Sequence, residues 1–223
     1  MSQLTDYALT RLRSLLPLAE RQRTLSPELQ KVHRSILQSL VHRGRPLNLT
    51  ECGRTAAGYD AATAILMLAS VDLVVVDSHG NPAGAYPLTT VTTPFEVTVD
   101  GNTIWAMCAL DAVSIAPTFD VTATIRSRCP VTGISIDITM QGNRIVETSP
   151  GTDPQVGVWW RDPGPVAAQG FCPGVVFLRD AAAASQWQAG RMDHEFVSLV
   201  DAVEIGERFF RPLLESRPEP VEA

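Results

Sequence analysis

Cys108 and Asp111 are the residues whose types and spacing point most directly to chemistry. Cys108 stands where an expected strand gives way to an expected helix over 108–116, and Asp111 follows three positions later. Residues three apart share one face of a helix, so the thiol and the carboxyl should be neighbours. A helix N-terminus lowers the pKa of a thiol, whereas partial burial raises the pKa of a carboxyl. The pair is therefore a candidate for a nucleophilic or metal-binding thiolate with a general acid beside it.

A structural role is the competing interpretation for every cysteine of the chain. Cys172 comes 64 positions after Cys108, in an expected strand over 171–178, and spacing alone does not bring the two together. The other two cysteines are Cys52 and Cys129. Free cysteine usually packs as a small buried hydrophobe, and Asp111 by itself could simply complement the first turn of its helix.

The sequence lacks the common motifs of catalytic and nucleotide-binding sites. It has no GxGxxG or GxxxxGK[ST] loop, no GxSxG motif, no HExxH pair and no CxxC. The four histidines, His33, His42, His79 and His194, are scattered along the chain. Nucleotide-binding, zinc and thioredoxin-type functions are therefore not expected.

The elements that must position these residues fall into two groups. The first group has predicted helices over 3–19, from Ser26 to Gly44, over 50–56 and over 59–70, followed by two short strands within 71–90. Three helices and a hairpin in this order are typical of a winged-helix module. The second group has predicted strands over 95–101, 102–107, 119–129, 133–142, 156–160 and 171–178, and predicted helices over 108–116, 181–190 and 195–214. Pro117 is expected to end the helix that starts at Cys108.

This pattern predicts an α+β protein. We expect an N-terminal helical, winged-helix-like module over 1–90 and a catalytic domain over 91–215, in which helices flank a mixed or antiparallel sheet. The last segment, 216–223, is expected to be a disordered tail.

The charge distribution tests whether the N-terminal module should bind nucleic acid. The 223-residue chain has a net charge of −6, yet residues 1–60 hold nine Lys and Arg against five acids. The candidate recognition helix and first wing strand, 59–76, contain no Lys or Arg, although phosphate contacts supply most of the affinity for DNA. We therefore expect a structural role for the module and no nucleic-acid partner.

Hydropathy gives no indication of a membrane partner. No segment approaches the roughly 18 consecutive apolar residues of a membrane span, and charged residues interrupt the N-terminal segment where a signal core would lie. We expect a cytoplasmic protein with reduced thiols.

Several stretches resemble the alkylmercury lyases (organomercurial lyases, MerB), in the order in which that family carries them. The string Trp105-Ala-Met-Cys108-Ala-Leu-Asp111-Ala is similar to the family's Cys-Ala-Leu-Asp signature after an aromatic-rich strand. Further similarities are Cys129 before Thr132-Gly133, Phe171-Cys172 before an apolar run, Trp187, and the closing helical segment over 195–214. The N-terminal winged-helix pattern also agrees, and the resemblance covers roughly residues 30–215.

The resemblance implies a carbon–mercury lyase that detoxifies organomercurials and contributes to mercury resistance. In the family, two cysteines bind the mercury of R–Hg⁺ and an aspartate protonates the carbon. This places the roles on Cys108, Cys172 and Asp111, which would also hold the product Hg(II). The family counterpart of Cys129 is structural. The resemblance implies neither NAD nor a resident metal cofactor, but it does imply cellular thiols for turnover and a mercuric reductase that could accept the Hg(II).

Three departures from the family pattern leave alternatives open, one of them being an N-terminal third that matches in pattern more than in residues. Met107 stands where many members have Trp, and Pro173 follows the second cysteine. Met is flexible and carries a soft sulfur, and Pro lacks an amide donor, which could re-aim Cys172. One alternative is a lyase-like enzyme with an altered substrate, such as an organotin or a biosynthetic metabolite. The other is a non-catalytic thiol sensor of metals, which could use the thiols without Asp111, whereas protonolysis requires an acid.

Overall fold

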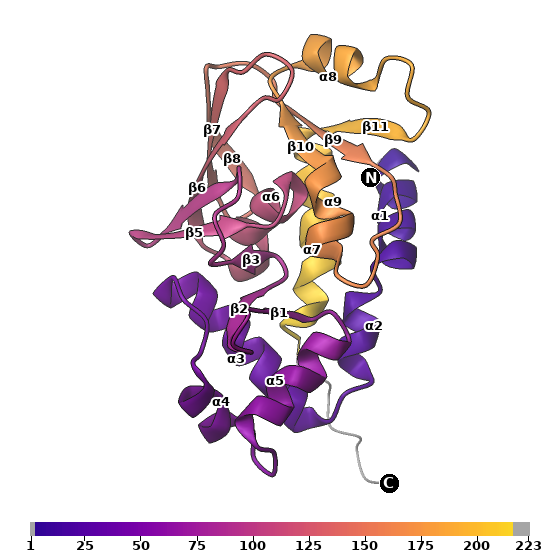
Figure 1. The fold of residues 1–223 in the computed structure, drawn as a ribbon. Coiled ribbons are helices and arrows are strands. Elements are labelled where there is room, and N and C mark those ends of the chain that lie inside the picture. Colours follow the sequence, from indigo (N-terminus) through magenta and orange to yellow (C-terminus); the bar gives the residue numbers. More distant parts are fainter. Residues whose placement is uncertain (1–2, 216–223) are drawn as a thin grey trace, which may run out of the picture.

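Residues 3–215, the part of the chain that this computed structural model describes, begin with a run of helices, and strands with helices between them follow (Figure 1). The helices are α1 (Gln3–Leu15), α2 (Leu18–Arg23), α3 (Pro27–Arg43), α4 (Leu49–Thr55), α5 (Ala61–Ser70), α6 (Ala109–Phe119), α7 (Ala167–Gly170), α8 (Ala181–Gln188), α9 (Leu199–Phe210) and the 3-10 helices η1 (Cys172–Gly174) and η2 (Arg211–Leu213). The strands are β1 (Val74–Val76), β2 (Pro82–Ala85), β3 (Leu88–Thr89), β4 (Glu96–Val99), β5 (Asn102–Ala106), β6 (Thr122–Arg128), β7 (Ser135–Gln141), β8 (Arg144–Ser149), β9 (Gln155–Trp159), β10 (Val175–Leu178) and β11 (His194–Ser198). The expected tail over 216–223 lies outside the described residues.

Local capping explains where α3 begins and ends, and it confirms the predicted helix from Ser26 to Gly44. The Ser26 side chain accepts a hydrogen bond from the amide of Leu29, and Pro27 occupies the first turn, where no amide donor is needed. Gly44 ends the helix in the left-handed conformation, with φ of 63°, which glycine adopts without steric cost.

The strands form two antiparallel sheets, as expected for an α+β protein with an antiparallel sheet. The larger has eight strands in the order β1-β2-β3-β5-β4-β6-β7-β8, and the smaller has the order β10-β9-β11. Figure 1 shows the larger sheet along the left, helices α1 and α2 along the right, and α3 to α5 at the bottom.

The N-terminal module has the predicted order of elements. Helices α3, α4 and α5 precede an antiparallel β1–β2 pair, in which Val74 lies opposite Ala85. Strand β2 then pairs with β3, and β3 with β5, so the larger sheet continues past residue 90. The winged-helix assignment and the division into domains at residue 90 stay predictions.

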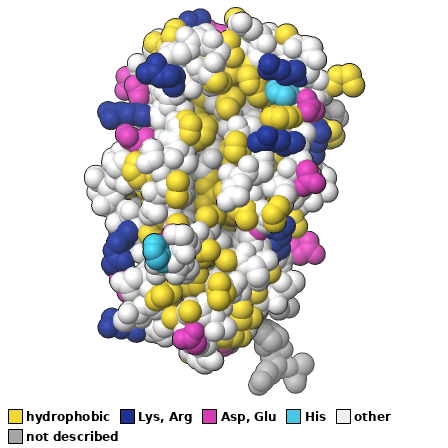
Figure 2. Space-filling model, in the orientation of Figure 1, with side chains coloured by type: hydrophobic (Ala, Val, Ile, Leu, Met, Phe, Trp, Pro, Cys, Tyr) yellow, Lys and Arg dark blue, Asp and Glu magenta, His cyan; other side chains and the backbone are white. Residues whose placement is uncertain are grey.

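The surface of α5 is apolar rather than basic. Leu66 and Met67 are its exposed large hydrophobic side chains. On the face shown in Figure 2, Lys and Arg side chains lie in several separate places with acidic side chains among them. The α5 surface therefore does not supply the positive charge that a DNA backbone requires.

Helix α6 lies at the centre of the molecule, between the larger sheet and α9. Every residue from Ala109 to Thr118 is buried. Gly206 of α9 comes so close that a Cβ there would lie 2.8 Å from the Cβ of Ser114. Helix α1 packs on the same α9, where Thr5 donates a hydrogen bond to Asp201 and Arg208 pairs with Asp6. Helix α9 therefore packs against both α6 and α1.

Four sequence predictions need correction. Pro117 does not end α6, which continues to Phe119, because near the end of a helix proline removes only one hydrogen bond. The predicted helix over 3–19 is divided at Pro17 into α1 and α2. The predicted strand over 171–178 begins only at Val175, after a 3-10 turn. The predicted helix over 195–214 begins as strand β11, so that α9 starts at Leu199.

No helix within residues 3–215 is long and apolar enough to cross a membrane.

Candidate active site

Cys108, Asp111 and Cys172 come together in the interior of the protein. One ligand atom from each, the two Sγ atoms and a carboxylate oxygen, lie within 4.8 Å of one another. The exposed fractions are 2% for Cys108, 4% for Asp111 and 2% for Cys172. Two thiols and one carboxyl therefore share a site from which bulk water is excluded.

The first two residues are placed by the start of α6. Cys108 is the N-cap residue of this helix, and its Sγ accepts a hydrogen bond from the amide of Asp111, with an N–S distance of 3.4 Å. Strand β5 delivers the chain to this point, and α6 then turns Asp111 onto the same side as the thiol. This confirms the predicted proximity of the two groups.

Cys172 reaches the site from a turn rather than from the predicted strand. It opens η1, directly after α7, and its thiol donates a hydrogen bond to Oδ2 of Asp111 at 3.7 Å. Gly170, just before it, packs so tightly that a Cβ there would lie 1.9 Å from the carbonyl oxygen of Pro163. Pro173 falls in the first turn of η1, where a missing amide costs no helical hydrogen bond.

Burial dominates the protonation of the three groups. It raises the pKa of Asp111 from 3.8 to about 7, despite hydrogen bonds from the two thiols that act in the opposite direction. Burial also raises the pKa of Cys108 well above its ordinary value. A hydrogen bond from Cys108 lowers the pKa of Cys172, but burial and the charge of Asp111 outweigh it and the net pKa is raised.

Burial therefore outweighs the helix N-terminus, whose Asp111 amide does act to lower the pKa of Cys108, and the net shift is opposite to the one expected from the helix alone. A helix N-terminus stabilises a nearby anion by about 0.3–1 kcal/mol at exposed sites, whereas a buried anion without a cation loses much more solvation energy. The site thus places two thiols whose pKa is raised beside a carboxyl whose pKa burial raises to about 7.

The site is closed in this structure. The cavity beside the three groups has a volume of about 10 Å³, which holds a single water molecule at most. Its other lining residues are Leu12, Leu16, Leu18, Tyr86, Leu110, Phe171, Phe209 and Phe210. Apolar side chains from both ends of the chain therefore cover the reactive groups.

Sequence reasoning missed a polar network that holds the segment before Cys172. The Tyr86 hydroxyl donates to Oδ1 of Asp72 at 2.8 Å and accepts from the amide of Ala168 at 2.9 Å. Oδ2 of Asp72 accepts from the amide of Ala167 at 3.1 Å and from Arg21 at 3.4 Å. The first two residues of α7 are thus tied to Asp72, before β1, and to Tyr86, directly after β2, and Asp72 in turn pairs with Arg21 of α2. The one available signal was Asp72 itself, a lone acid within the apolar run Val71–Val76.

The remaining cysteines lie elsewhere. Cys129 is buried in the turn between β6 and β7, where its carbonyl accepts a hydrogen bond from the amide of Gly133. Cys52 is buried in α4, and burial raises its pKa to about 11. Neither belongs to the cluster of Cys108, Asp111 and Cys172.

Known proteins share both the sequence pattern and the fold. A sequence model of the family described as alkylmercury lyase matches residues 88–211. The alkylmercury lyase of Staphylococcus epidermidis is 31% identical over 152 residues, which cover 68% of this chain and 69% of that protein. That of Pseudomonas putida is 29% identical over 181 residues, covering 81% of this chain and 84% of that protein. The crystal structure of the mercury-bound form of MerB2 has the same fold, with a TM-score of 0.74 at 20% identity, covering 89% of this chain and 98% of that chain.

Proposed function

The chain belongs to the alkylmercury lyase family, and from that premise we propose that it cleaves carbon–mercury bonds by protonolysis at Cys108, Asp111 and Cys172. The products are a hydrocarbon and Hg(II) held on the two thiolates. The observation that carries these residue roles is the closed cluster itself, in which two soft ligands and one acid lie within 4.8 Å.

The two thiols suit the mercury end of the substrate. Thiolates are soft ligands that match a soft, thiophilic metal, and coordination to a cation deprotonates a thiol even when burial has raised its pKa. One cysteine replaces the ligand that R–Hg⁺ carries, and the second adds to the same mercury. Each thiolate pushes electron density towards the carbon and makes that carbon basic enough to accept a proton.

Asp111 suits the carbon end of the substrate. Cys172 already donates its hydrogen bond to the carboxyl, so the proton released when Cys172 binds mercury has an acceptor at 3.7 Å. A carboxyl with a pKa of about 7 holds this proton and gives it up readily, which is the property of an efficient general acid at neutral pH. The carbon takes the proton as the Hg–C bond breaks, and both electrons of that bond remain with the hydrocarbon.

The proposed reaction requires no NAD and no resident metal, since the mercury is substrate and product. Free thiols are needed to remove Hg(II) from two protein thiolates, and a mercuric reductase is the proposed final acceptor. We place the protein in the cytoplasm, where such thiols are abundant. The four cysteines are all free in the structure, which agrees with a reducing compartment.

Benzene release from phenylmercury tests the proposal. The purified protein is supplied with excess small thiol, beside Cys172→Ser as the control. We expect more than one benzene per protein from the wild type and none above background from the variant. A folded wild-type protein that binds phenylmercury without releasing benzene would contradict the lyase and favour a thiol sensor or another substrate.

A further inference from the structure

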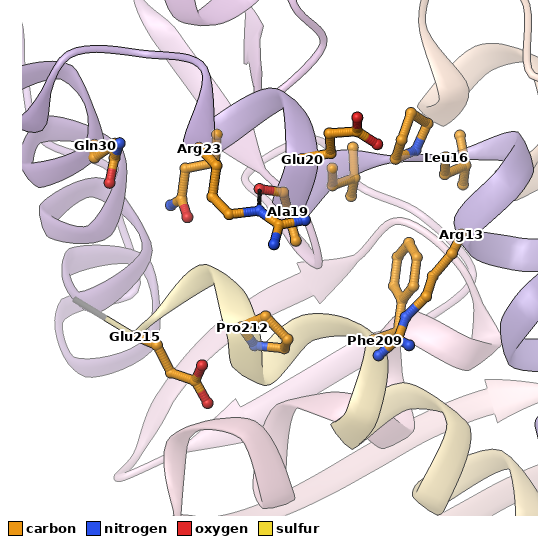
Figure 3. A pocket seen from close by; sticks show the side chains of 12 residues that line it. Arg13, Leu16, Ala19, Glu20, Arg23, Gln30, Phe209, Pro212 and Glu215 are labelled. Carbon is orange, nitrogen blue, oxygen red and sulfur yellow. Dashed lines mark hydrogen bonds between the residues drawn. The ribbon is translucent and has the colours of Figure 1, made fainter. Parts of the chain in front are cut away.

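A second, larger cavity adjoins the closed reaction cavity. It has a volume of about 460 Å³ and lies between the end of α1, α2 and η2 (Figure 3). We call it the outer cavity. Its lining includes Arg13, Ala19, Glu20 and Arg23, and three further residues that line the reaction cavity as well: Leu16, Leu18 and Phe209. A single layer of side chains therefore separates the two cavities.

We call Leu16, Leu18 and Phe209 the partition. We infer that their side chains change conformation to connect the two cavities. All three side chains are apolar, so no side-chain hydrogen bond holds them in place. Leu16 and Leu18 flank Pro17, at the break between α1 and α2, where the backbone leaves the helical conformation with ψ of 51°. Rotamer changes at this break cost little compared with the disruption of a helix.

The other side of the reaction cavity is fixed by polar contacts. There Leu12, Leu110 and Phe171 separate it from a small cavity beside Trp160. The indole of Trp160 donates to Glu195 at 2.8 Å, Glu195 pairs with Arg11 at 3.1 Å, and the Arg11 guanidinium lies 4.5 Å from the centre of the Trp160 ring. These contacts hold Trp160 and Glu195, which line the small cavity, so a ligand entering from that side would have to pass them, and we take the partition as the path.

The rim of the outer cavity carries charges of both signs. Arg13 is anchored to α9 by a hydrogen bond to the carbonyl of Arg208, and Arg23 donates through Nε to the carbonyl of Ala19. Figure 3 shows Arg23 and Glu20 on the α2 side of the cavity and a second acid, Glu215, across from Arg23 beside Pro212. Guanidinium groups bind carboxylates, and a carboxylate such as Glu20 binds an ammonium group. The cavity therefore suits a small ligand that has both a carboxylate and an ammonium group.

We propose that the outer cavity binds the organomercurial as its adduct with an amino-acid-type thiol and passes R–Hg⁺ across the partition to Cys108 and Cys172. This inference rests on the proposed function and adds the path and the form of the substrate. The transfer is a ligand exchange. A site thiol forms the new S–Hg bond, the bond to the carrier sulfur breaks, and the proton of the site thiol goes to the departing thiolate. The same cavity admits the free thiol that removes Hg(II) after the reaction.

Two variants with opposite expected effects test the path. Ala19→Trp fills the outer cavity, and Leu16→Ala opens the partition. The matched control is Ala182→Trp, at an exposed position of α8. The measurement is the rate at which phenylmercury titrates the site thiols, which does not depend on turnover. We expect Ala19→Trp to slow this reaction by about tenfold or more, as steric changes in pockets typically do, and Leu16→Ala to accelerate it. Unchanged rates in both folded variants would overturn the path.

The form of the substrate is tested with two carriers. Phenylmercury is supplied as its cysteine adduct or as its 2-mercaptoethanol adduct, which lacks both charges. We expect the double variant Arg13→Gln, Arg23→Gln to lose about tenfold more kcat/KM on the cysteine adduct, as when one charge-assisted hydrogen bond is removed. Equal losses on the two adducts would overturn the proposed ligand class. Benzene release by the wild type keeps the lyase proposal intact in either case, so the two failures are distinguishable.

Discussion

The thiols of Cys129 and Cys108 are almost equally buried, but the pKa of the first is lowered and that of the second is raised. Cys129 is 1% exposed and Cys108 is 2% exposed. Burial acts to raise the pKa of Cys129 too, but hydrogen bonds from the Thr132 side chain and from backbone amides outweigh it, and the net pKa is lowered. At the reaction centre the hydrogen bonds to Cys108 from the Asp111 amide and to Cys172 from Cys108 do not outweigh the opposing effects, and the pKa of Cys108 and Cys172 is raised.

The difference shows that thiol acidity alone does not identify a mercury-processing site. By pKa, Cys129 is the better thiolate, yet it stands alone in a turn. Cys108 and Cys172 are weaker acids, but they offer two sulfur ligands and a carboxyl that takes up and returns the proton. The proposed reaction requires the combination, and in that proposal mercury itself deprotonates the thiols when it binds.

The largest effect that would sharpen this comparison comes from the carboxyl. Asp111→Asn keeps the shape of the side chain and removes its acidic proton. We expect benzene release from bound phenylmercury to slow by about 10²–10⁴-fold, the usual contribution of a general acid. Single-turnover kinetics on the preloaded protein, with mercury binding measured separately, checks this. A variant that binds and cleaves at the wild-type rate would show that Asp111 is not the acid.

The pH dependence of stability comes next in size. The pKa of Asp111 is raised on folding, so its contribution to stability is complete below about pH 4 and is lost as pH rises through about 7. The shift from 3.8 to about 7 corresponds to roughly 4 kcal/mol. His33, whose pKa burial lowers to about 4, acts in the opposite sense between these pH values.

Comparing the wild type with Asp111→Asn therefore separates the effect of Asp111 on stability from that of His33. Denaturant unfolding of the wild type and of Asp111→Asn is measured from pH 4 to pH 8. We expect the free energy of unfolding of the wild type, relative to the variant, to fall across this range. Parallel curves would indicate that the carboxyl ionises normally in the folded protein.

Tyr86→Phe tests whether the reaction centre depends on the network that holds α7. The substitution removes the hydrogen bond to Asp72 and leaves the Ala168 amide without its acceptor. We therefore expect the free energy of unfolding to fall by about 2 kcal/mol. Because this network holds the segment before Cys172, kcat should fall as well. The control is Tyr59→Phe, whose hydroxyl donates to Ser26 at 3.2 Å far from the site. An equal loss of activity in both variants would contradict a specific role of Tyr86.

Cys129→Ser should have the smallest effect. We expect a stability loss of about 1 kcal/mol, typical of a single buried substitution, with benzene release unchanged. Thermal unfolding and turnover are measured on the same preparation. Lost turnover at an unchanged Tm would reverse the assignment and place Cys129 in the reaction.

The sequence was informative where function depends on neighbours within one helix. The spacing of Cys108 and Asp111 and the strand-to-helix transition were sufficient to predict that the two groups meet. The approach of Cys172 was not predictable from spacing, because its position depends on contacts of α7 with Tyr86 and Asp72 and with the loop before it. Only the family resemblance joined it to the other two.

The residues that cover the reaction cavity also could not be predicted from the local sequence. Pro17 divides the N-terminal helix, and the resulting turn places Leu16 and Leu18 over the reaction cavity. The predicted helix over 3–19 gave no partner for its residues, because the contact with α9 joins opposite ends of the chain. The direction of the Cys108 pKa shift failed for the same reason, since burial is a property of the whole fold.

The joint cover formed by α1, α2 and α9 has a consequence for biosynthesis. A ribosome delivers Cys108, Asp111 and Cys172 before it delivers Phe209 and Phe210, which line the reaction cavity. A nascent chain that ends before α9 therefore carries its thiols unshielded, with ordinary acidity and open to oxidants. Only after α9 has emerged does α1 find its partner, so the reaction centre matures in one late step and chains truncated before α9 cannot acquire it.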